Sequence, residues 1–366
     1  MAGKLPQVTI AVIGDCNHGK STLTGQLLYK TGHIDQRTVD MTAKQAADIG
    51  KGSFKFAFLV DKTKSERERE LTIDFHTNVL ATNKFTFTLI DTPGHYLFIK
   101  NTITGTAMAG VAIVVVEAWK GRFEYATTVG HGNLREKIAA AKSLGVEQFI
   151  VCINKMDTID YSWVRYEEVK DLLSIVVKKL GVRMRRVSFI PISAFFGENI
   201  NTKSSKMAWY KGGTLLDELN KLRAPRIVAL DKGLRIPISN VYDIKGVGTV
   251  AVGRIERGIL KPGMTLRFAE VGLAGKISSI ETFHLKVGEA KAGDYVGFHI
   301  EGVKASQLTR GMVASDANKD PARCVRQFRA RIVVTADFKK HLQLNPDTRR
   351  LWTATLPTSA VRSLYS

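Results

Sequence analysis

The stretch from Gly14 to Thr22, GDCNHGKST, limits what this chain can fold into more than any other part of its sequence. It fits the pattern G-x-x-x-x-G-K-[ST], and the apolar run VTIAVI before it is typical of a buried strand. Backbone N–H groups of such a loop turn toward a di- or triphosphate, and the following helix directs its positive end at it. The pattern predicts a strand, a phosphate-binding loop and a helix, with Lys20 adding a charge and Ser21 placed to bind Mg²⁺. A glycine-rich turn without a ligand is the alternative that this stretch alone leaves open.

A second polar motif, DTPGH, follows the predicted strand FTFTLI. Asp91 at the end of that strand can hold a metal ion through water, and Gly94 can turn its N–H toward a terminal phosphate because it has no side chain. His95 comes directly after this turn and is the candidate catalytic residue, although a lone histidine is more often structural. The motif therefore predicts the reactive end of a nucleotide site.

Two more strand ends carry residues suited to a guanine base. The run FIVCI leads to NKMD, in which the carboxylate of Asp157 can accept hydrogen bonds from the N1–H and 2-amino groups of guanine, which adenine lacks. The run FIPI leads to Ser193, Ala194 and Phe195, whose backbone N–H groups can reach the guanine carbonyl. Together with the phosphate loop, these motifs predict a guanine nucleotide site.

The segment DKTKSERERELTID, from Asp61 to Asp74, alternates in charge. Such a run is typical of a solvated helix face. It leads to Thr72, a hydroxyl between the phosphate loop and the next strand, where a segment ordered by Mg²⁺ and a γ-phosphate is expected.

Strands alternate with helices up to about Leu222, and the polar motifs all follow strand ends. This order predicts an α/β fold, a doubly wound nucleotide-binding domain over residues 1–224. Beyond it the helical period stops, and short strands separated by turns predict an antiparallel β-barrel over residues 225–321. Residues 322–346 are expected to begin a second, partial β-barrel.

The composition of the chain indicates which kinds of partner it can bind and in which cellular compartment it is expected. The chain has 54 Lys and Arg against 34 Asp and Glu, a net charge of +20, which favours polyanions such as RNA. Three cysteines without paired or metal-ligand spacing fit a reducing compartment, and the longest apolar run, Val111 to Val116, is too short to span a bilayer. We expect a cytoplasmic protein that is a monomer and has no membrane partner.

The motifs in this order resemble the translational GTPases of the elongation factor Tu family, and in particular the eukaryotic and archaeal elongation factor one-alpha branch. The stretches SERERELTID, FIKNTITGT, KMAWYKGGTLL and GDYVGFHIEGV are similar to that branch as well. The resemblance implies a GTPase with GTP or GDP and Mg²⁺ as cofactors. It also implies aminoacyl-tRNA, the ribosome and a guanine nucleotide exchange factor as partners.

The resemblance also implies a role for each matching position. Ser21, Thr72 and Asp91 would hold the metal, and His95 would position the attacking water once the ribosome has ordered the site. The nucleotide-binding residues would be Gly14, Asp15, Cys16, Asn17, His18, Gly19, Lys20, Ser21, Thr22, Asp91, Thr92, Pro93, Gly94, Asn154, Lys155, Met156, Asp157, Ser193, Ala194 and Phe195.

The chain departs from the family at three places in or beside the nucleotide motifs. One is the pair Tyr96 and Leu97, which follows DTPGH where the family has Arg and Asp. Asp15, Cys16 and Asn17 stand where the family has His-Val-Asp, so a carboxylate near the γ-phosphate becomes an amide. Glu70 stands where the family has glycine. We expect nucleotide binding to persist, because the backbone does most of it, and cation handling and the rate of hydrolysis to change.

The barrel departs from the family in its tRNA-facing residues. Glu281 is kept at the position that faces the terminal adenosine of tRNA, but Phe283 and Tyr295 replace the usual His and Asn of the pocket for the esterified amino acid. This predicts weaker binding of aminoacyl-tRNA than in a typical member. Two alternatives are a release or ribosome-rescue GTPase that partners a tRNA-mimic protein, and a nucleotide-binding paralogue that delivers nothing.

The last residues differ from the third-domain sequence that the family would have. A shift of one base after Pro346 lets the codons of residues 347–359 read Gly-Tyr-Thr-Pro-Thr-Val-Asp-Cys-His-Thr-Ala-His-Val, which is that sequence. We therefore expect residues 347–366 to be an out-of-frame tail, with a natural divergent tail as the alternative.

Overall fold

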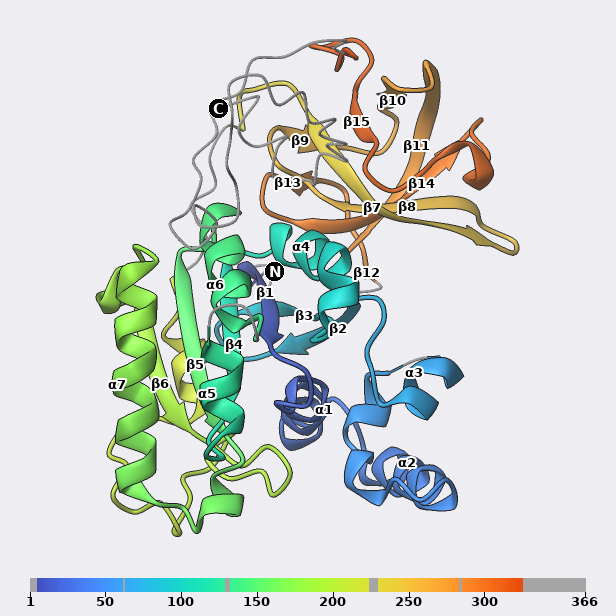
Figure 1. The fold of residues 1–366 in the computed structure, drawn as a ribbon. Helices are drawn as coiled ribbons and strands as arrows, with labels where there is room; N and C mark the ends of the chain where they lie inside the picture. The colour runs from blue at the N-terminus through green and yellow to red at the C-terminus, as the bar shows by residue number, and fades with distance from the viewer. Residues whose placement is uncertain (1–4, 62, 129–131, 224–229, 283–284, 325–366) are drawn as a thin grey trace, which may run out of the picture. The chain divides into compact units, whose positions relative to one another are not determined.

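The computed structural model describes residues 5–61, 63–128, 132–223, 230–282 and 285–324. The chain divides into two compact units, Met1–Arg226 and Ile227–Ser366, and each is treated by itself (Figure 1). The expectations for Phe283 and for residues 325–366, which include the partial second barrel and the out-of-frame tail, lie outside the described residues.

The first unit is built on a sheet in the order β2-β3-β1-β4-β5-β6. Neighbouring strands from β3 to β6 pair in parallel, and β2 pairs antiparallel with β3 at one edge. Parallel strands covered on both faces are apolar throughout, which is why these runs were recognisable in the sequence. The strands are β1 (Gln7–Gly14), β2 (His76–Ala81), β3 (Thr86–Asp91), β4 (Val111–Glu117), β5 (Gln148–Asn154) and β6 (Val187–Pro191).

Helices cover both faces of this sheet (Figure 1). One core contains side chains of α5 (Arg122–Thr127), α6 (Leu134–Ser143) and α7 (Trp163–Lys179), and the other contains those of α1 (Lys20–Lys30) and α8 (Leu215–Asn220). The arrangement is the doubly wound α/β fold predicted from the sequence. The remaining helices of the unit are α2 (Gln36–Asp48), α3 (Lys64–Arg69), α4 (Ile99–Ala107) and the short η1 (Gly52–Phe54), η2 (Ala57–Leu59), η3 (Tyr96–Phe98), η4 (Met156–Ile159) and η5 (Met184–Arg186).

The second unit is a closed antiparallel barrel, as predicted. Its strands follow the order β10-β15-β7-β8-β14-β11, and β11 pairs back with β10 to close the ring. Alternate residues point into one core, which contains Ile236, Phe268 and Phe298. Its elements are β7 (Arg235–Ile244), β8 (Gly248–Arg254), β9 (Ile259–Leu260), β10 (Thr265–Phe268), β11 (Leu273–Thr282), β12 (Leu285–Lys286), β13 (Ala290–Lys291), β14 (Tyr295–Glu301), η6 (Ala305–Gln307) and β15 (Val313–Asp316).

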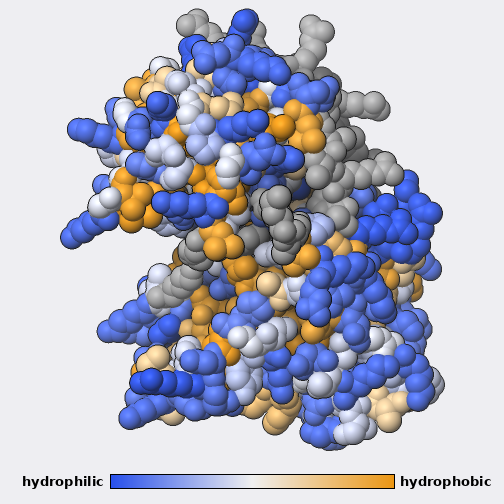
Figure 2. Space-filling model, turned by 180° about the vertical axis from the view of Figure 1, so that it is seen from behind, coloured by the Kyte–Doolittle hydropathy of each residue, from blue (hydrophilic) through white to orange (hydrophobic). Residues whose placement is uncertain are grey.

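The face of the molecule in Figure 2 is mostly hydrophilic, with smaller apolar areas between the charged side chains. Within the described residues, no helix combines the length and the apolar character needed to cross a membrane.

Candidate functional site

The first unit contains a cavity of about 420 Å³ that is lined by all the polar motifs of the sequence. Parallel strands end at one edge of a sheet, so the loops after β1, β3, β5 and β6 meet there. Sequence reasoning did not assign Ser53, Phe54, Ala57, Asp61, Leu71, Glu117 or Arg122 to the site. The residues that line the cavity are Cys16, Asn17, Gly19, Lys20, Ser21, Thr22, Ser53, Phe54, Ala57, Asp61, Glu70, Leu71, Thr72, Gly94, Glu117, Arg122, Asn154, Lys155, Asp157, Ala194 and Phe195.

The phosphate loop is tightly packed and presents a buried lysine. Lys20 is 6% exposed, and its Nζ donates a hydrogen bond of 2.9 Å to the carbonyl oxygen of Asp15. Burial lowers the pKa of Lys20, and the carboxylate of Asp91 opposes that shift. Gly19 has φ 90°, and a side-chain carbon there would lie 2.4 Å from Nδ2 of Asn154, so the loop requires glycine at this position. An ammonium held in this way is suited to the oxygens of a polyphosphate.

A set of oxygen donors lies beside the lysine. The hydroxyls of Ser21 and Thr72 are 3.2 Å apart, and the Thr72 hydroxyl donates to Oδ1 of Asp61 at 3.2 Å. Asp91 is 0% exposed, and neither of its carboxylate oxygens has a hydrogen-bond partner among the described residues. Burial raises the pKa of Asp91 to about 6, against the opposing effects of the Ser21 hydroxyl and the Lys20 ammonium. Mg²⁺ prefers oxygen ligands, and this group offers two hydroxyls and the unpartnered carboxylate of Asp91, so it is suited to that ion.

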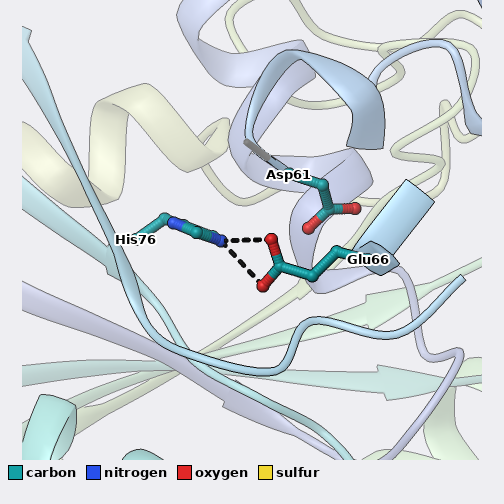
Figure 3. A group of neighbouring side chains, drawn as sticks. All are labelled: Asp61, Glu66 and His76. Carbon is teal, nitrogen blue, oxygen red and sulfur yellow. Dashed lines mark hydrogen bonds and ion pairs between the residues drawn. The ribbon is translucent and has the colours of Figure 1, made fainter. Parts of the chain in front are cut away.

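The charged segment before Thr72 is held by a buried carboxylate, Glu66, in α3 (Figure 3). Glu66 is 1% exposed, and both of its oxygens lie 3.0 Å from Nε2 of His76 on β2. It also accepts hydrogen bonds from the backbone N–H of Ile73 at 2.9 Å and from the hydroxyl of Thr63 at 2.8 Å. The prediction of a solvated helix face is wrong at this position.

Asp61 completes this group, and its ligand atoms lie within 4.8 Å of those of Glu66 and His76. Burial and, to a smaller extent, the charges of Asp91 and Glu66 together raise the pKa of Asp61 to about 7. The Glu66 carboxylate is already satisfied by donors from its own segment and from β2, so we assign the Glu66–His76 pair a structural role: it fixes Thr72 at the cavity.

Glu70 occupies a backbone position that favours glycine. It caps the C-terminus of α3 with φ 56° and ψ 29°, which is left-handed, and its carboxylate lines the cavity while pairing with Lys51 at 3.0 Å. A left-handed residue other than glycine costs about 1–2 kcal/mol. The side chain of Glu70 therefore strains the backbone and adds a negative charge to the lining of the cavity.

We expect Glu70→Gly to raise the free energy of unfolding by about 1 kcal/mol, because it relieves the left-handed strain. Both Glu70→Gly and Glu70→Gln should raise the affinity for GTP severalfold, because each removes a negative charge beside the phosphates. Thermal unfolding and titration with a fluorescent GTP analogue measure the two effects. Glu68→Gln is the matched control, since Glu68 is exposed on the same helix and does not line the cavity. An unchanged affinity in Glu70→Gln would contradict the charge argument.

The guanine end of the cavity is tied to the phosphate loop by Asn154. Its Nδ2 donates to the carbonyl oxygen of His18 at 2.8 Å, and its Oδ1 accepts from the backbone N–H of Ala194 at 2.9 Å. Oδ1 of Asp157 accepts a hydrogen bond of 2.5 Å from the Ser193 hydroxyl. These bonds hold the carboxylate of Asp157 and the loop at Ser193 and Ala194 at one end of the cavity.

Several expected nucleotide-binding residues lie behind the cavity instead of lining it. Gly14 packs so closely on β4 that a side-chain carbon would be 2.3 Å from the carbonyl oxygen of Val115. His18 is buried, its Nδ1 lies 3.3 Å from that same oxygen, and burial lowers its pKa to about 3. The Thr92 hydroxyl donates to the carbonyl oxygen of Val12 at 2.7 Å. The other expected residues outside the lining are Asp15, Asp91, Pro93, Met156 and Ser193.

His95 is not among the residues that line the cavity. Its ring lies 4.6 Å from that of Tyr96, and its Nδ1 accepts a hydrogen bond from the backbone N–H of Leu97 at 3.3 Å. In this arrangement a neutral ring carries its proton on Nε2. In this structure the ring of His95 packs on Tyr96, and His95 does not line the cavity.

In the barrel, Glu281 and Tyr295 lie on the same face. Glu281 on β11 is opposite Gly297 on β14, and Tyr295 is two residues from Gly297. Glu281 is exposed, whereas the hydroxyl of Tyr295 is 3.0 Å from that of Ser239 and its pKa is raised to about 12 by burial. The side chain of Tyr295 therefore extends from β14 across β8 to Ser239 on β7, and Glu281 stands on β11, on the other side of β14.

Comparison with known proteins agrees with this architecture. Residues 5–225 match the elongation factor Tu GTP binding domain, and residues 248–315 match elongation factor Tu domain 2. The elongation factor 1-alpha of Entamoeba histolytica is 47% identical over 327 residues, which are 89% of this chain and 74% of that protein. That of Desulfurococcus mucosus is 44% identical and covers 91% of this chain and 76% of that protein.

Solved structures share the fold at lower identity. The GTPase-like domain of S. cerevisiae Ski7 bound to GTP has a TM-score of 0.70 and 21% identity, covering 87% of this chain and 76% of that chain. A bacterial selenocysteine-specific elongation factor has a TM-score of 0.64 and 23% identity over 86% of this chain, and this chain spans less than half of its length, 45%. On the sequence relationships, the chain belongs to the elongation factor Tu family of translational GTPases.

Proposed function

We propose that this chain binds GTP and GDP with Mg²⁺, hydrolyses GTP and delivers aminoacyl-tRNA to the ribosomal A site. The observation that carries the proposal is the single cavity in which Lys20, Thr72 and Asp157 come together. These residues belong to the phosphate loop, the segment before β2 and the loop after β5, and their chemistry matches phosphate, metal and base. We also propose that the protein is cytoplasmic and monomeric, and that it works with a guanine nucleotide exchange factor.

Hydrolysis would need positioning and charge stabilisation and no covalent intermediate. The phosphate loop and Lys20 would bind the β- and γ-phosphates. Ser21, Thr72 and Asp91 would hold Mg²⁺, which supplies positive charge to the phosphate oxygens when bound. His95 would turn inward on the ribosome and orient the attacking water through its ring nitrogen.

The test is nucleotide binding and turnover by the full chain. A fluorescent GTP analogue should bind in Mg²⁺, should be displaced by GTP and GDP but not by ATP, and should bind more weakly in EDTA. Ribosomes should stimulate turnover, and His95→Ala should lower that turnover more than tenfold while retaining affinity for GTP. Equal competition by ATP would exclude the guanine site, and turnover that ribosomes do not change would exclude the translational role.

Binding of aminoacyl-tRNA should be weaker than in a conventional relative at the same salt concentration. Tyr295 stands on the same face of the barrel as Glu281, at a position where the family has a smaller, more polar side chain. Dissociation constants of the GTP complexes measure the difference, and Tyr295→Asn should move the value toward that of the relative. Equal affinities in the two unaltered proteins would contradict this prediction.

The same observation favours a second candidate, a release or ribosome-rescue GTPase whose partner is a tRNA-mimic protein. Such a partner carries no esterified amino acid. A GTPase that binds it would therefore not need to preserve the pocket for that amino acid. Ribosome-stimulated turnover that is independent of aminoacyl-tRNA, together with no measurable tRNA complex, would support this candidate over delivery.

A further inference from the structure

Helix α6 carries a buried lysine that none of the nucleotide motifs includes. Lys137 is 1% exposed, and its ammonium donates hydrogen bonds to the carbonyl oxygens of Gly14, at 2.9 Å, and of Gly94. It also lies 3.8 Å from Oδ1 of Asp15. An ammonium has three N–H donors and no acceptor, so two of its donors are used by these carbonyl oxygens, and Asp15 supplies a nearby opposite charge. Burying a charged lysine costs free energy unless partners compensate it, so Lys137 differs from an ordinary surface lysine.

The three oxygens belong to two loops that meet at the cavity. Gly14 and Asp15 begin the phosphate loop, whereas Gly94 lies in the loop after β3. The loops are in close contact, because a side-chain carbon on Gly94 would be 2.5 Å from Nζ of Lys20 and 2.9 Å from the carbonyl oxygen of Asp15. Oδ2 of Asp15 also accepts from the backbone N–H of Asn133, the residue before α6, at 3.4 Å. The first turn of α6 therefore fixes both loops.

We propose that Lys137 is a positioning residue that holds the Gly94 loop where a terminal phosphate binds, so that the site favours a nucleoside triphosphate over a diphosphate. The proposal rests on the proposed function, because it takes the ligand of the cavity to be a guanine nucleotide. Nζ of Lys20 marks the place of the β- and γ-phosphates, and the Gly94 backbone lies beside it. A diphosphate has no group that reaches this loop, so loosening the loop weakens GTP binding alone.

Lys137 has a second effect that both nucleotides share. It compensates the carboxylate of Asp15, whose charge would otherwise repel any polyphosphate in the loop. Removing Lys137 should therefore weaken GDP as well as GTP, and the ratio of the two affinities separates positioning from charge.

The experiment measures affinities for GTP and GDP in the wild type, Lys137→Met, Asp15→Asn and the double variant. Lys137→Met should weaken both nucleotides and lower the ratio of GTP to GDP affinity about tenfold. The double variant should regain affinity for GDP, because it no longer carries the uncompensated charge of Asp15. Its ratio of GTP to GDP affinity should stay as low as in Lys137→Met. Lys142→Met is the control, since Lys142 is an exposed lysine of the same helix, and should leave both affinities unchanged.

A ratio that stays at the wild-type value in Lys137→Met, or that returns to it in the double variant, would overturn the proposal. Should Lys137→Met fail to fold, Lys137→Gln keeps a donor group but is too short to hold both loops, and it should also lower the ratio. A wild-type ratio in Lys137→Gln would overturn the proposal equally. A wild-type protein that binds neither nucleotide would instead refute the proposed function.

Discussion

Asp157→Asn is expected to lower the affinity for GTP by about 100-fold or more. The carboxylate of Asp157 is held by the Ser193 hydroxyl at 2.5 Å, and Asp157 lines the same cavity as the phosphate loop. An asparagine there loses one acceptor and presents an N–H group to the 2-amino group of guanine, which leaves buried donors unpaired. The same amide matches xanthine, whose C2 carbonyl accepts a hydrogen bond, so the affinity for XTP should rise.

Competition of GTP and XTP against a fluorescent nucleotide measures this exchange of preference. Asp160→Asn is the matched control: Asp160 is exposed three residues further along, and its φ of 50° is one that asparagine tolerates. It should leave both affinities unchanged. If Asp157→Asn binds GTP as tightly as the wild type, the guanine base does not contact Asp157.

The fold of the first unit was predictable because its strands are apolar runs that end in polar motifs. A strand buried on both faces needs no alternation, so Val111–Glu117 and Gln148–Asn154 stand out in the sequence as continuous hydrophobic segments. The edge strand His76–Ala81, HTNVLA, was not recognised, because it is short, half polar and without a clear alternation of buried and exposed residues. The barrel was recognised from the spacing of its turns.

The motif part of the site was predictable because each motif combines its ligand groups within a few residues. The residues that support them were not, because their partners are far along the chain. Lys137 bonds to a carbonyl 123 residues away, and the hydroxyls of Ser21 and Thr72 meet across 51 residues. Glu66 looks like one charge in a solvated run until the fold brings His76 to it. A charged side chain in a polar run gives no signal of burial before its partner is known.

Glu66→Gln is expected to lower the free energy of unfolding by about 3 kcal/mol, the typical cost of breaking a buried charged pair. The amide can accept at only one of its two terminal atoms, so it loses either the donors on Thr63 or the backbone N–H of Ile73. The imidazolium of His76 would then be buried without its counter-charge. Because the segment that Glu66 holds carries Thr72, the affinity for GTP in Mg²⁺ should fall as well.

The dependence on pH distinguishes this pair from a general loss of packing. Hydrogen bonds to His76 and to backbone donors hold the pKa of Glu66 at about 2, so its contribution is present above pH 4.5 and is lost as the pH falls toward 2. Hydrogen bonding to Glu66 raises the pKa of His76 despite burial, so its contribution is present below pH 6.5 and is lost as the pH rises through the raised value. The pair should therefore stabilise the protein most between about pH 4.5 and 6.5.

Urea unfolding of the wild type and of Glu66→Gln across this range measures the difference between them. Burial raises the pKa of Asp61 to about 7 and the charge of Glu66 adds to that shift, so part of the difference near pH 7 comes from Asp61, and the comparison rests on the values at pH 3 and between pH 4.5 and 6.5. Glu68→Gln is the control, because Glu68 is exposed and its ion pair with Lys64, at 3.7 Å, is worth little. The difference should shrink at pH 3 and above pH 8. A difference that is constant with pH would mean that shape, and not the Glu66–His76 charge pair, holds the Thr72 segment at the nucleotide cavity.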